Sequence, residues 1–171
     1  PELKGQEHPV VAAQLWTRSA HAERPEDLDI GISPSHLLDP ASSPSGVIFS
    51  LGLELMLARS QGFVKLASTD PSVPPRIRFN HLLDPADMQR MVAAFRLARQ
   101  LAATEPLKSL IVEELYPGPQ VGDAEAEIVA ALERGAMTLQ HPSCTCRMGR
   151  PDDPLSVVDA EGRVHGIEAL R

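Results

Sequence analysis

The most distinctive stretch of this chain is His141–Gly149 (HPSCTCRMG), which is followed by Ser156–Asp159 (SVVD) and Arg163–Ile167 (RVHGI). A His-Pro pair leads into small residues that indicate a tight turn. Pro142 stiffens that turn, because its ring restricts the backbone and removes an N–H donor. The SVVD segment predicts a strand, and the last residues of the chain are expected to lie in another. An imidazole on such a turn is suited to accept and return a proton near neutral pH. A lone histidine after an apolar run is nevertheless more often a hydrogen-bonded structural residue, so these residues by themselves leave both roles of His141 open.

Segments upstream of this stretch form an ordered series of motifs. Three of them are Gly62–Ser68 (GFVKLAS), Asp84–Asp87 (DPAD) and Ala93–Leu101 (AAFRLARQL). Together with the His141 stretch they resemble the C-terminal part of the glucose–methanol–choline (GMC) family of flavin-dependent oxidoreductases. The motif match covers about residues 60 to 171, and residues 1–59 fit the substrate-domain sheet of that family less distinctively.

The resemblance implies both a reaction and a set of site residues. His141 matches the catalytic histidine of the family, which takes the hydroxyl proton of an alcohol while a hydride passes to N5 of the flavin. Gln140 and Leu139 directly precede it and are expected beside the substrate, and Phe49 on the sheet is expected to wall the pocket. The second catalytic residue of the family, a His or an Asn, would lie beyond Arg171.

FAD would be held mainly by residues outside this chain. The sequence contains no Gly-x-Gly-x-x-Gly phosphate-binding loop, so the usual Rossmann route to a dinucleotide is absent from it. The resemblance therefore implies a partner, the N-terminal FAD-binding portion of the same enzyme, and a small alcohol substrate. Residues 1–155 are predicted to form the substrate-binding domain, and residues 156–171 the start of a truncated segment that returns to the FAD-binding domain.

The expected fold class is α+β, an antiparallel β-sheet with helices packed on one side. Apolar runs that indicate strands are separated by loops rich in Pro, Ser and Asp, with no helix between them. They cover residues 10–16, 28–33, 47–56 (expected to be buried on both faces), 63–68 and 76–79. One helix is expected to begin at Asp84–Pro85 and to end before Glu105, and a second to run from about Asp123 to Gly135.

The first helix carries an apolar stripe at three- and four-residue spacing, which predicts a surface that faces the core. Members of the stripe are Met88, Met91, Val92, Phe95, Ala98, Leu101 and Ala102. Four polar residues of the same helix are expected largely off this face: Arg90, Arg96, Arg99 and Gln100.

Composition argues against several function classes. The chain has 171 residues, enough for a core, and a net charge of −7 without a basic stripe. This balance argues against nucleic acid and anionic membrane surfaces as partners. No apolar run approaches the roughly 20 residues of a membrane-spanning helix, and the first residues lack the pattern of a signal peptide. The cytoplasm is the expected compartment.

The two cysteines, Cys144 and Cys146, lie close to His141 in sequence. These three residues have metal-binding side chains, but no fourth ligand is evident, so no metal site is expected. A disulfide across one intervening residue would be strained, which favours the interpretation of both as small buried turn residues. Many members of the family have glycine at the position of Cys144, and a side chain is tolerable there if the backbone is not left-handed.

Several alternatives remain open. Within the same family the chain could belong to a hydroxynitrile lyase, in which the histidine only moves protons. It could be an isolated substrate-binding or interaction domain without catalysis, or one segment of a nicked enzyme. The preferred substrate is an aryl or aliphatic primary alcohol, with O₂ or another electron acceptor undecided. His165, next to Gly166, is interpreted as structural.

Overall fold

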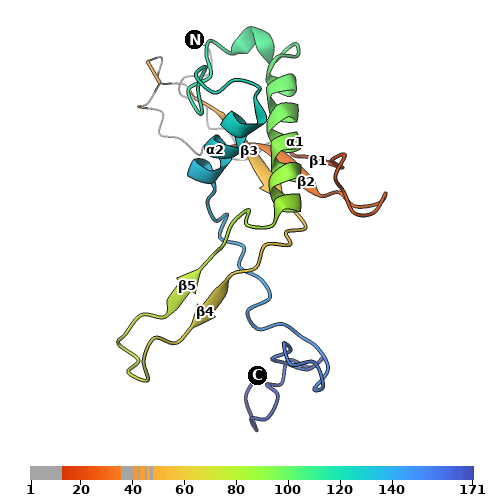
Figure 1. The fold of residues 1–171 in the computed structure, drawn as a ribbon, viewed down its shortest axis with the longest axis vertical. Coiled ribbons are helices and arrows are strands. Elements are labelled where there is room, and N and C mark those ends of the chain that lie inside the picture. Colours follow the sequence, from red (N-terminus) through yellow and green to blue (C-terminus); the bar gives the residue numbers. More distant parts are fainter. Residues whose placement is uncertain (1–12, 36–40, 42, 45, 47) are drawn as a thin grey trace. The chain divides into compact units, whose positions relative to one another are not determined.

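The computed structural model describes residues 13–35, 41, 43, 44, 46 and 48–171. These residues divide into two compact units (Figure 1). Unit 1 consists of the residues up to Gln61 together with Asn80–Ala136, and unit 2 consists of Gly62–Phe79 together with Met137–Arg171. This division rests on contacts alone, and the predicted domain boundary between residues 155 and 156 stays a prediction.

Unit 1 contains a three-stranded antiparallel sheet. The strands are β1 (Leu15–Thr17), β2 (Ile30–Ser35) and β3 (Ser50–Leu55), in the order β1-β2-β3. In the register, Ile32 is paired with Leu15 on one side and with Leu53 on the other. The expected positions of these strands are confirmed, although the parts of them at residues 10–12 and 47 lie outside the described residues. Strand β3 is half-buried along its whole length, so the prediction of burial on both faces is wrong.

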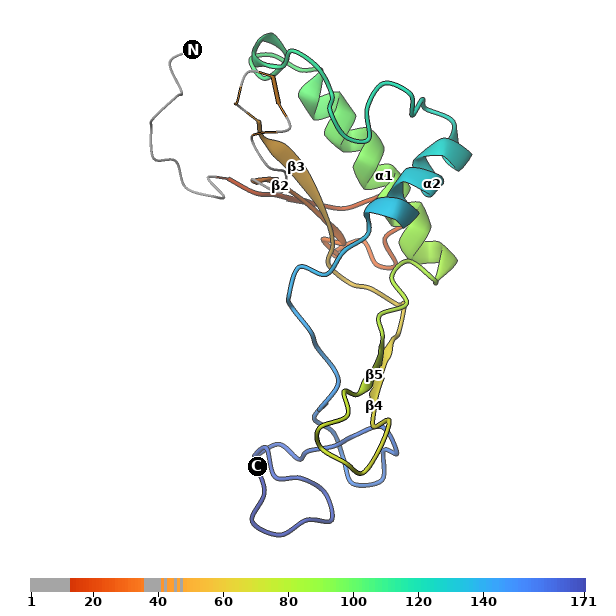
Figure 2. The same cartoon turned by 90° about the vertical axis from the view of Figure 1, so that its left-hand side faces the viewer.

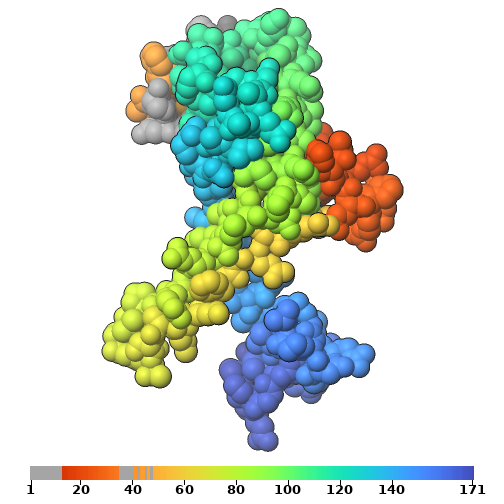
Figure 3. Space-filling view, viewed as in Figure 1, coloured from red at the N-terminus to blue at the C-terminus, as the bar shows by residue number. Residues whose placement is uncertain are grey.

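The helices of unit 1 are α1 (Pro85–Ala102) and α2 (Glu125–Gly135), with a short 3-10 helix, η2 (Lys108–Leu110), between them. Both α-helices lie on the same side of the sheet (Figure 2). Helix α1 contacts β2, β3 and α2. The side chains of α1 and α2 form one continuous packed surface in unit 1 (Figure 3). The predicted α+β class, with an antiparallel sheet and helices on one side, is therefore confirmed.

Helix α1 begins where its sequence predicts. The Asp84 carboxylate accepts a hydrogen bond from the Ala86 N–H (2.8 Å), and Pro85 occupies the first turn, where its missing N–H costs no helical hydrogen bond. The apolar stripe faces the core as expected. Buried residues of this core cluster come from α1, from α2 and from the loop between them: Met91, Val92, Phe95, Val121, Ile128, Ala131 and Leu132.

Arg90 is the exception on α1, because its side chain is 2% exposed and lies beside the fully buried Asp87. The prediction that Arg90 lies off the buried face is therefore wrong. The helical period predicts that charged residues lie outside the core. Here the Asp87 carboxylate, three residues earlier, pairs with the guanidinium and offsets the free-energy cost of burying its charge.

Unit 2 contains an antiparallel hairpin made of β4 (Phe63–Lys65) and β5 (Arg76–Arg78). A β-carbon on Gly62 would lie 2.0 Å from the carbonyl oxygen of Arg78, so only glycine allows the two chains to come this close. None of the described residues of unit 2 is buried. This unit therefore has no hydrophobic core of its own.

The second part of unit 2, Met137–Arg171, has isolated bridges in place of strands. Met148 bridges to Val158 in parallel, and Val158 bridges to Val164 in antiparallel orientation. The expected strands at Ser156–Asp159 and at the end of the chain are therefore wrong. Turns at residues 150–156 and 159–163 interrupt the extended chain before a ladder can form.

Among the described helices, none combines the length and the apolar character needed to cross a membrane.

Candidate functional site

His141 lies in unit 2 on a turn without regular secondary structure, and its side chain is exposed. Two residues near it adopt left-handed backbone angles, Gln140 (φ 61°) and Cys144 (φ 67°). The Gln140 N–H donates to the Thr138 hydroxyl oxygen at 3.0 Å, which closes a local turn just before the histidine. The imidazole is therefore carried on an exposed segment between two left-handed residues.

Apolar side chains near His141 in sequence are also exposed. Leu139 is 44% exposed, and Met137 and Met148 are more exposed still. An exposed imidazole flanked by exposed apolar side chains offers a surface that a flat aromatic ring system could cover.

A hydrogen-bonded frame follows directly after the His141 turn. The Gly149 N–H donates to the Val158 carbonyl (2.9 Å), the Val157 N–H donates to the Arg147 carbonyl (2.9 Å), and the His165 N–H donates to the Val157 carbonyl (3.0 Å). These bonds join three passes of the chain whose bonded residues are eight to ten positions apart in sequence. The motifs RMG, SVVD and RVHG therefore build one small frame, held by backbone hydrogen bonds and not by a core.

Two aspartates close the turns of this frame. Asp153 accepts the Leu155 N–H (2.9 Å) and forms an ion pair with Arg147. The pKa of Asp153 is lowered, first by the backbone bond from Leu155 and then by Arg147. Partial burial would raise the pKa of Asp159, but its bonds from Arg163 and from the Glu161 N–H outweigh this and lower it. Both carboxylates are therefore held in the charged form that these bonds require.

His165 belongs to the frame and not to the His141 turn. Its Nε2 lies 3.2 Å from the Gly149 carbonyl oxygen, and its ring is partly buried. The interpretation of His165 as a structural residue agrees with this contact.

The two cysteines are both free and exposed, so the prediction that they are buried is wrong. Cys144 has a left-handed backbone, which is the condition under which a side chain is poorly tolerated. The backbone at Cys144 is therefore strained. Among the described residues, no group of three or more metal-binding side chains is close enough to hold an ion.

The predicted site residues fall in both units. Leu139, Gln140 and His141 are consecutive residues of unit 2, whereas Phe49 precedes β3 in unit 1 and is 39% exposed. The assignment of all four to catalysis or to the substrate pocket stays a prediction.

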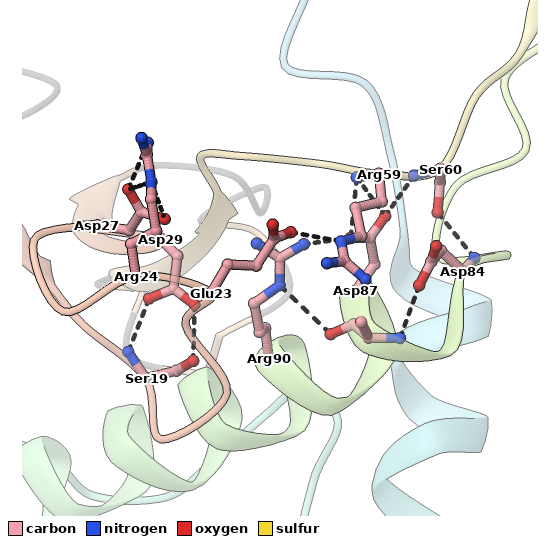
Figure 4. Close-up of polar contacts among 11 residues, drawn as sticks. Ser19, Glu23, Arg24, Asp27, Asp29, Arg59, Ser60, Asp84, Asp87 and Arg90 are labelled. Atoms are coloured by element: carbon pink, nitrogen blue, oxygen red, sulfur yellow. Dashed lines mark hydrogen bonds and ion pairs between the residues drawn. The ribbon is translucent and has the colours of Figure 1, made fainter.

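Sequence reasoning missed a buried polar cluster at the start of α1 (Figure 4). Asp87 accepts backbone N–H bonds from Arg59 (3.0 Å) and Ser60 (2.7 Å) and forms an ion pair with Arg90. Burial alone would raise the pKa of Asp87, but the bonds from Ser60, Arg59 and Arg90 lower it. The only signal for this cluster in the sequence is an Asp and an Arg three residues apart on one helix.

A second buried carboxylate in the same unit organises the turn after β1. Asp29 is fully buried and accepts bonds from the backbone N–H and the hydroxyl of Ser19, both at 2.7 Å (Figure 4). Buried carboxylates satisfied in this way stabilise one chain conformation. Neither cluster lies in the unit that carries His141.

The sequence model of the GMC oxidoreductase family matches residues 58–171, which include every motif of the His141 stretch. The chain belongs to the GMC oxidoreductase family. The match begins just before the Asp87 cluster and runs through the hairpin, α1 and α2 to the His141 turn.

Relatives with curated names support the same family. Patulin synthase from Aspergillus clavatus is 42% identical over 123 residues, which cover 71% of this chain and 19% of that protein. Mitochondrial choline dehydrogenase from Mus musculus is 36% identical over 146 residues, which cover 85% of this chain and 24% of that protein. This GMC chain thus spans about a fifth to a quarter of the length of these relatives.

Solved structures show the same fold. Pyridoxine 4-oxidase from Mesorbium loti superposes with a TM-score of 0.70 at 24% identity, covering 92% of this chain and 31% of that one. A fungal aryl-alcohol oxidase superposes with a TM-score of 0.62 at 25% identity, and the match covers 84% of this chain and 22% of that one.

Proposed function

We propose that this chain is the C-terminal part of an FAD-dependent alcohol oxidoreductase, an oxidase or a dehydrogenase. It supplies the catalytic histidine and part of the substrate pocket. The observation that carries the proposal is the placement of His141, exposed on a turn between left-handed residues within the family-matched region.

FAD fits this chain as a group bound mainly by other residues. The exposed apolar side chains beside His141 suit an aromatic ring, whereas the sequence offers no phosphate-binding loop. When bound, FAD supplies a hydride acceptor at N5. Leu139 and Gln140 of this chain would then lie on the substrate side, with Phe49 as a wall of the pocket.

His141 takes the proton of the substrate hydroxyl as the hydride leaves the adjacent carbon, so the alcohol becomes a carbonyl compound. The imidazole passes this proton to solvent before the next turnover. A base placed in this way accelerates the reaction by about 10²–10⁴-fold. Pro142 restricts the turn that carries the ring, which keeps the imidazole oriented.

A small alcohol is the proposed substrate, with an aryl or aliphatic primary alcohol preferred. The names of the relatives include a choline dehydrogenase, a pyridoxine oxidase and an aryl-alcohol oxidase. We propose the N-terminal FAD-binding portion of the enzyme as the partner. The cytoplasm is proposed as the compartment, since two exposed free thiols are compatible with a reducing environment.

An isolated binding domain is less compatible with the structure, because none of the described residues of unit 2 is buried. A segment without a core is not expected to keep one conformation alone. A hydroxynitrile lyase would share His141 but would form a cyanohydrin or cleave one without net oxidation, so product analysis separates it.

The test is alcohol-dependent flavin reduction, followed by stopped-flow absorbance in the complete enzyme. His141→Ala should slow reduction by about 10²–10⁴-fold. His21→Ala, which removes an exposed histidine of unit 1, is the matched control and should leave the rate unchanged. Equal rates in the two variants would contradict the role of His141.

A further inference from the structure

The β4–β5 hairpin has two chemically different faces. Val64 is paired with Ile77, and their neighbours in the ladder are the pairs Phe63–Arg78 and Lys65–Arg76. Because successive side chains of a strand point to opposite faces, Val64 and Ile77 share one face and the two flanking pairs share the other. Leu66 and Phe79 each lie one residue beyond the end of β4 and β5 and are also exposed. These four residues form what we call the apolar face.

The apolar face is open to solvent in this chain. Its side chains are 50% (Val64), 80% (Leu66), 49% (Ile77) and 56% (Phe79) exposed. A two-stranded hairpin is marginally stable in water unless one face is packed against something. A contiguous exposed apolar surface of this kind typically marks an interface.

The opposite face is cationic and is not suited to burial. It carries Lys65, Arg76 and Arg78 beside Phe63, and Lys65 stacks over the Phe63 ring at 5.0 Å. None of these three cations forms an ion pair within the part of the chain that the structure describes. Burial of an unpaired cation is strongly unfavourable. The apolar face is therefore the one that packs.

The residues that flank the hairpin in sequence, Arg59–Gln61 and Asn80, make hydrogen bonds within unit 1. On the β4 side, Ser60 and Arg59 donate backbone N–H bonds to the buried Asp87. On the β5 side, the Asn80 side chain donates to the Gln61 carbonyl at 2.9 Å. Both ends of the segment are thus joined before the hairpin begins, so the apolar face is presented by a closed loop and not by a loose chain.

The hairpin belongs to the same compact unit as the His141 segment. The chain covers only 19–24% of the length of its curated relatives, so most of the polypeptide of such enzymes lies outside it. A domain that brings FAD to His141 must contact unit 2. The same domain can cover both segments of that unit, the hairpin and the His141 segment.

We propose that the apolar face of the hairpin docks on the FAD-binding part of the enzyme, with the cationic face left in water. The identity of this partner rests on the proposed function. The docking would anchor unit 2, which has no core of its own, and would hold the His141 turn in place against the partner.

Cysteine labelling in the complete enzyme tests which face is covered. Ile77→Cys and Phe63→Cys place one thiol on each face, at positions that are 49% and 40% exposed in this chain. Maleimide labelling of the native enzyme, read by mass spectrometry on separate peptides, should be at least tenfold slower for Ile77→Cys than for Phe63→Cys. Equal rates would overturn the proposal, because exposure within this chain alone predicts nearly equal labelling.

Photo-cross-linking identifies what covers the apolar face. Benzoylphenylalanine in place of Ile77 should cross-link to peptides of the FAD-binding part. Cross-links to a second copy of this chain would overturn the proposal, as would a protection at Ile77→Cys that disappears on dilution to the monomer. Neither measurement depends on catalytic turnover. If the His141→Ala test contradicts the proposed function, the labelling and cross-linking results still test the docking proposal by themselves.

Discussion

Unit 1 and unit 2 are stabilised by different kinds of interaction. Unit 1 packs α1 and α2 on a sheet and buries a cluster of apolar side chains between the helices. Unit 2 holds its chain with turns, bridges and backbone hydrogen bonds, and none of its described residues is buried. Because hydrophobic burial is the main favourable term in folding, unit 1 is expected to behave as a scaffold and unit 2 as a surface completed by a partner. The candidate catalytic histidine lies in the second kind of structure.

The largest expected effect comes from the buried ion pair of unit 1. Asp87→Ala removes the carboxylate that neutralises Arg90 and accepts two backbone N–H groups. A buried charge left without its partner costs about 3–5 kcal/mol. The free energy of unfolding, measured with denaturant, should fall by that amount. Asp123→Ala, which removes a carboxylate that is 92% exposed, is the control and should change it by less than about 0.5 kcal/mol.

The core of unit 1 gives the next largest effect. Ile128 is fully buried in the cluster between α1 and α2. Ile128→Ala should destabilise the protein by about 2–5 kcal/mol, because it removes apolar contacts and leaves a cavity. Val112→Ala serves as the matched control, since Val112 is 95% exposed. A similar loss in both variants would mean that unit 1 has no specific core, and the comparison of the units would fail.

Relief of strain at the His141 turn should have a smaller effect, of the opposite sign. A left-handed backbone costs an ordinary residue about 1–2 kcal/mol, and glycine loses about 0.5–1 kcal/mol more chain entropy on folding. Cys144→Gly should therefore stabilise unit 2 by up to roughly 1 kcal/mol. Slower amide hydrogen exchange across residues 137–149 would report it. Cys146→Gly has no left-handed angle to relieve and should speed exchange.

Acid should loosen the frame of unit 2 through its aspartates, and this is the smallest effect. The pKa values of Asp153 and Asp159 are lowered in the fold. Their contribution to stability is therefore complete above the pKa of an unfolded Asp, about 4. It is lost as the pH falls further, through the folded values. The Leu155 and Glu161 N–H groups donate to these carboxylates, so their protection factors against amide exchange should fall below about pH 4. Asp159→Asn should remove the pH dependence of the protection factor at Glu161; an unchanged pH profile would contradict this role.

The sequence predicted helix α1 well because local signals agree there. Asp84 caps the helix, Pro85 suits its first turn, and the apolar stripe repeats with the helical period. Burial of Arg90 could not be predicted in the same way. Its partner Asp87 also accepts N–H groups from Arg59 and Ser60, which lie 28 and 27 residues before Asp87, and sequence spacing does not report such a contact. The strand expected at Ser156–Asp159 is wrong for a local reason, because turns closed by Asp153 and Asp159 interrupt the extended chain on both sides of it.

The sequence by itself determined the family and singled out His141 as the candidate catalytic residue. The motif order from Gly62 to Ile167 and the His-Pro pair require no knowledge of distant contacts. Only the tertiary structure decided that Cys144 is left-handed, that Arg90 is buried, and that the described residues of unit 2 lack a core. Motifs record chemistry and local backbone preference. Burial and strain depend on which distant segments meet, and that is settled only when the chain folds.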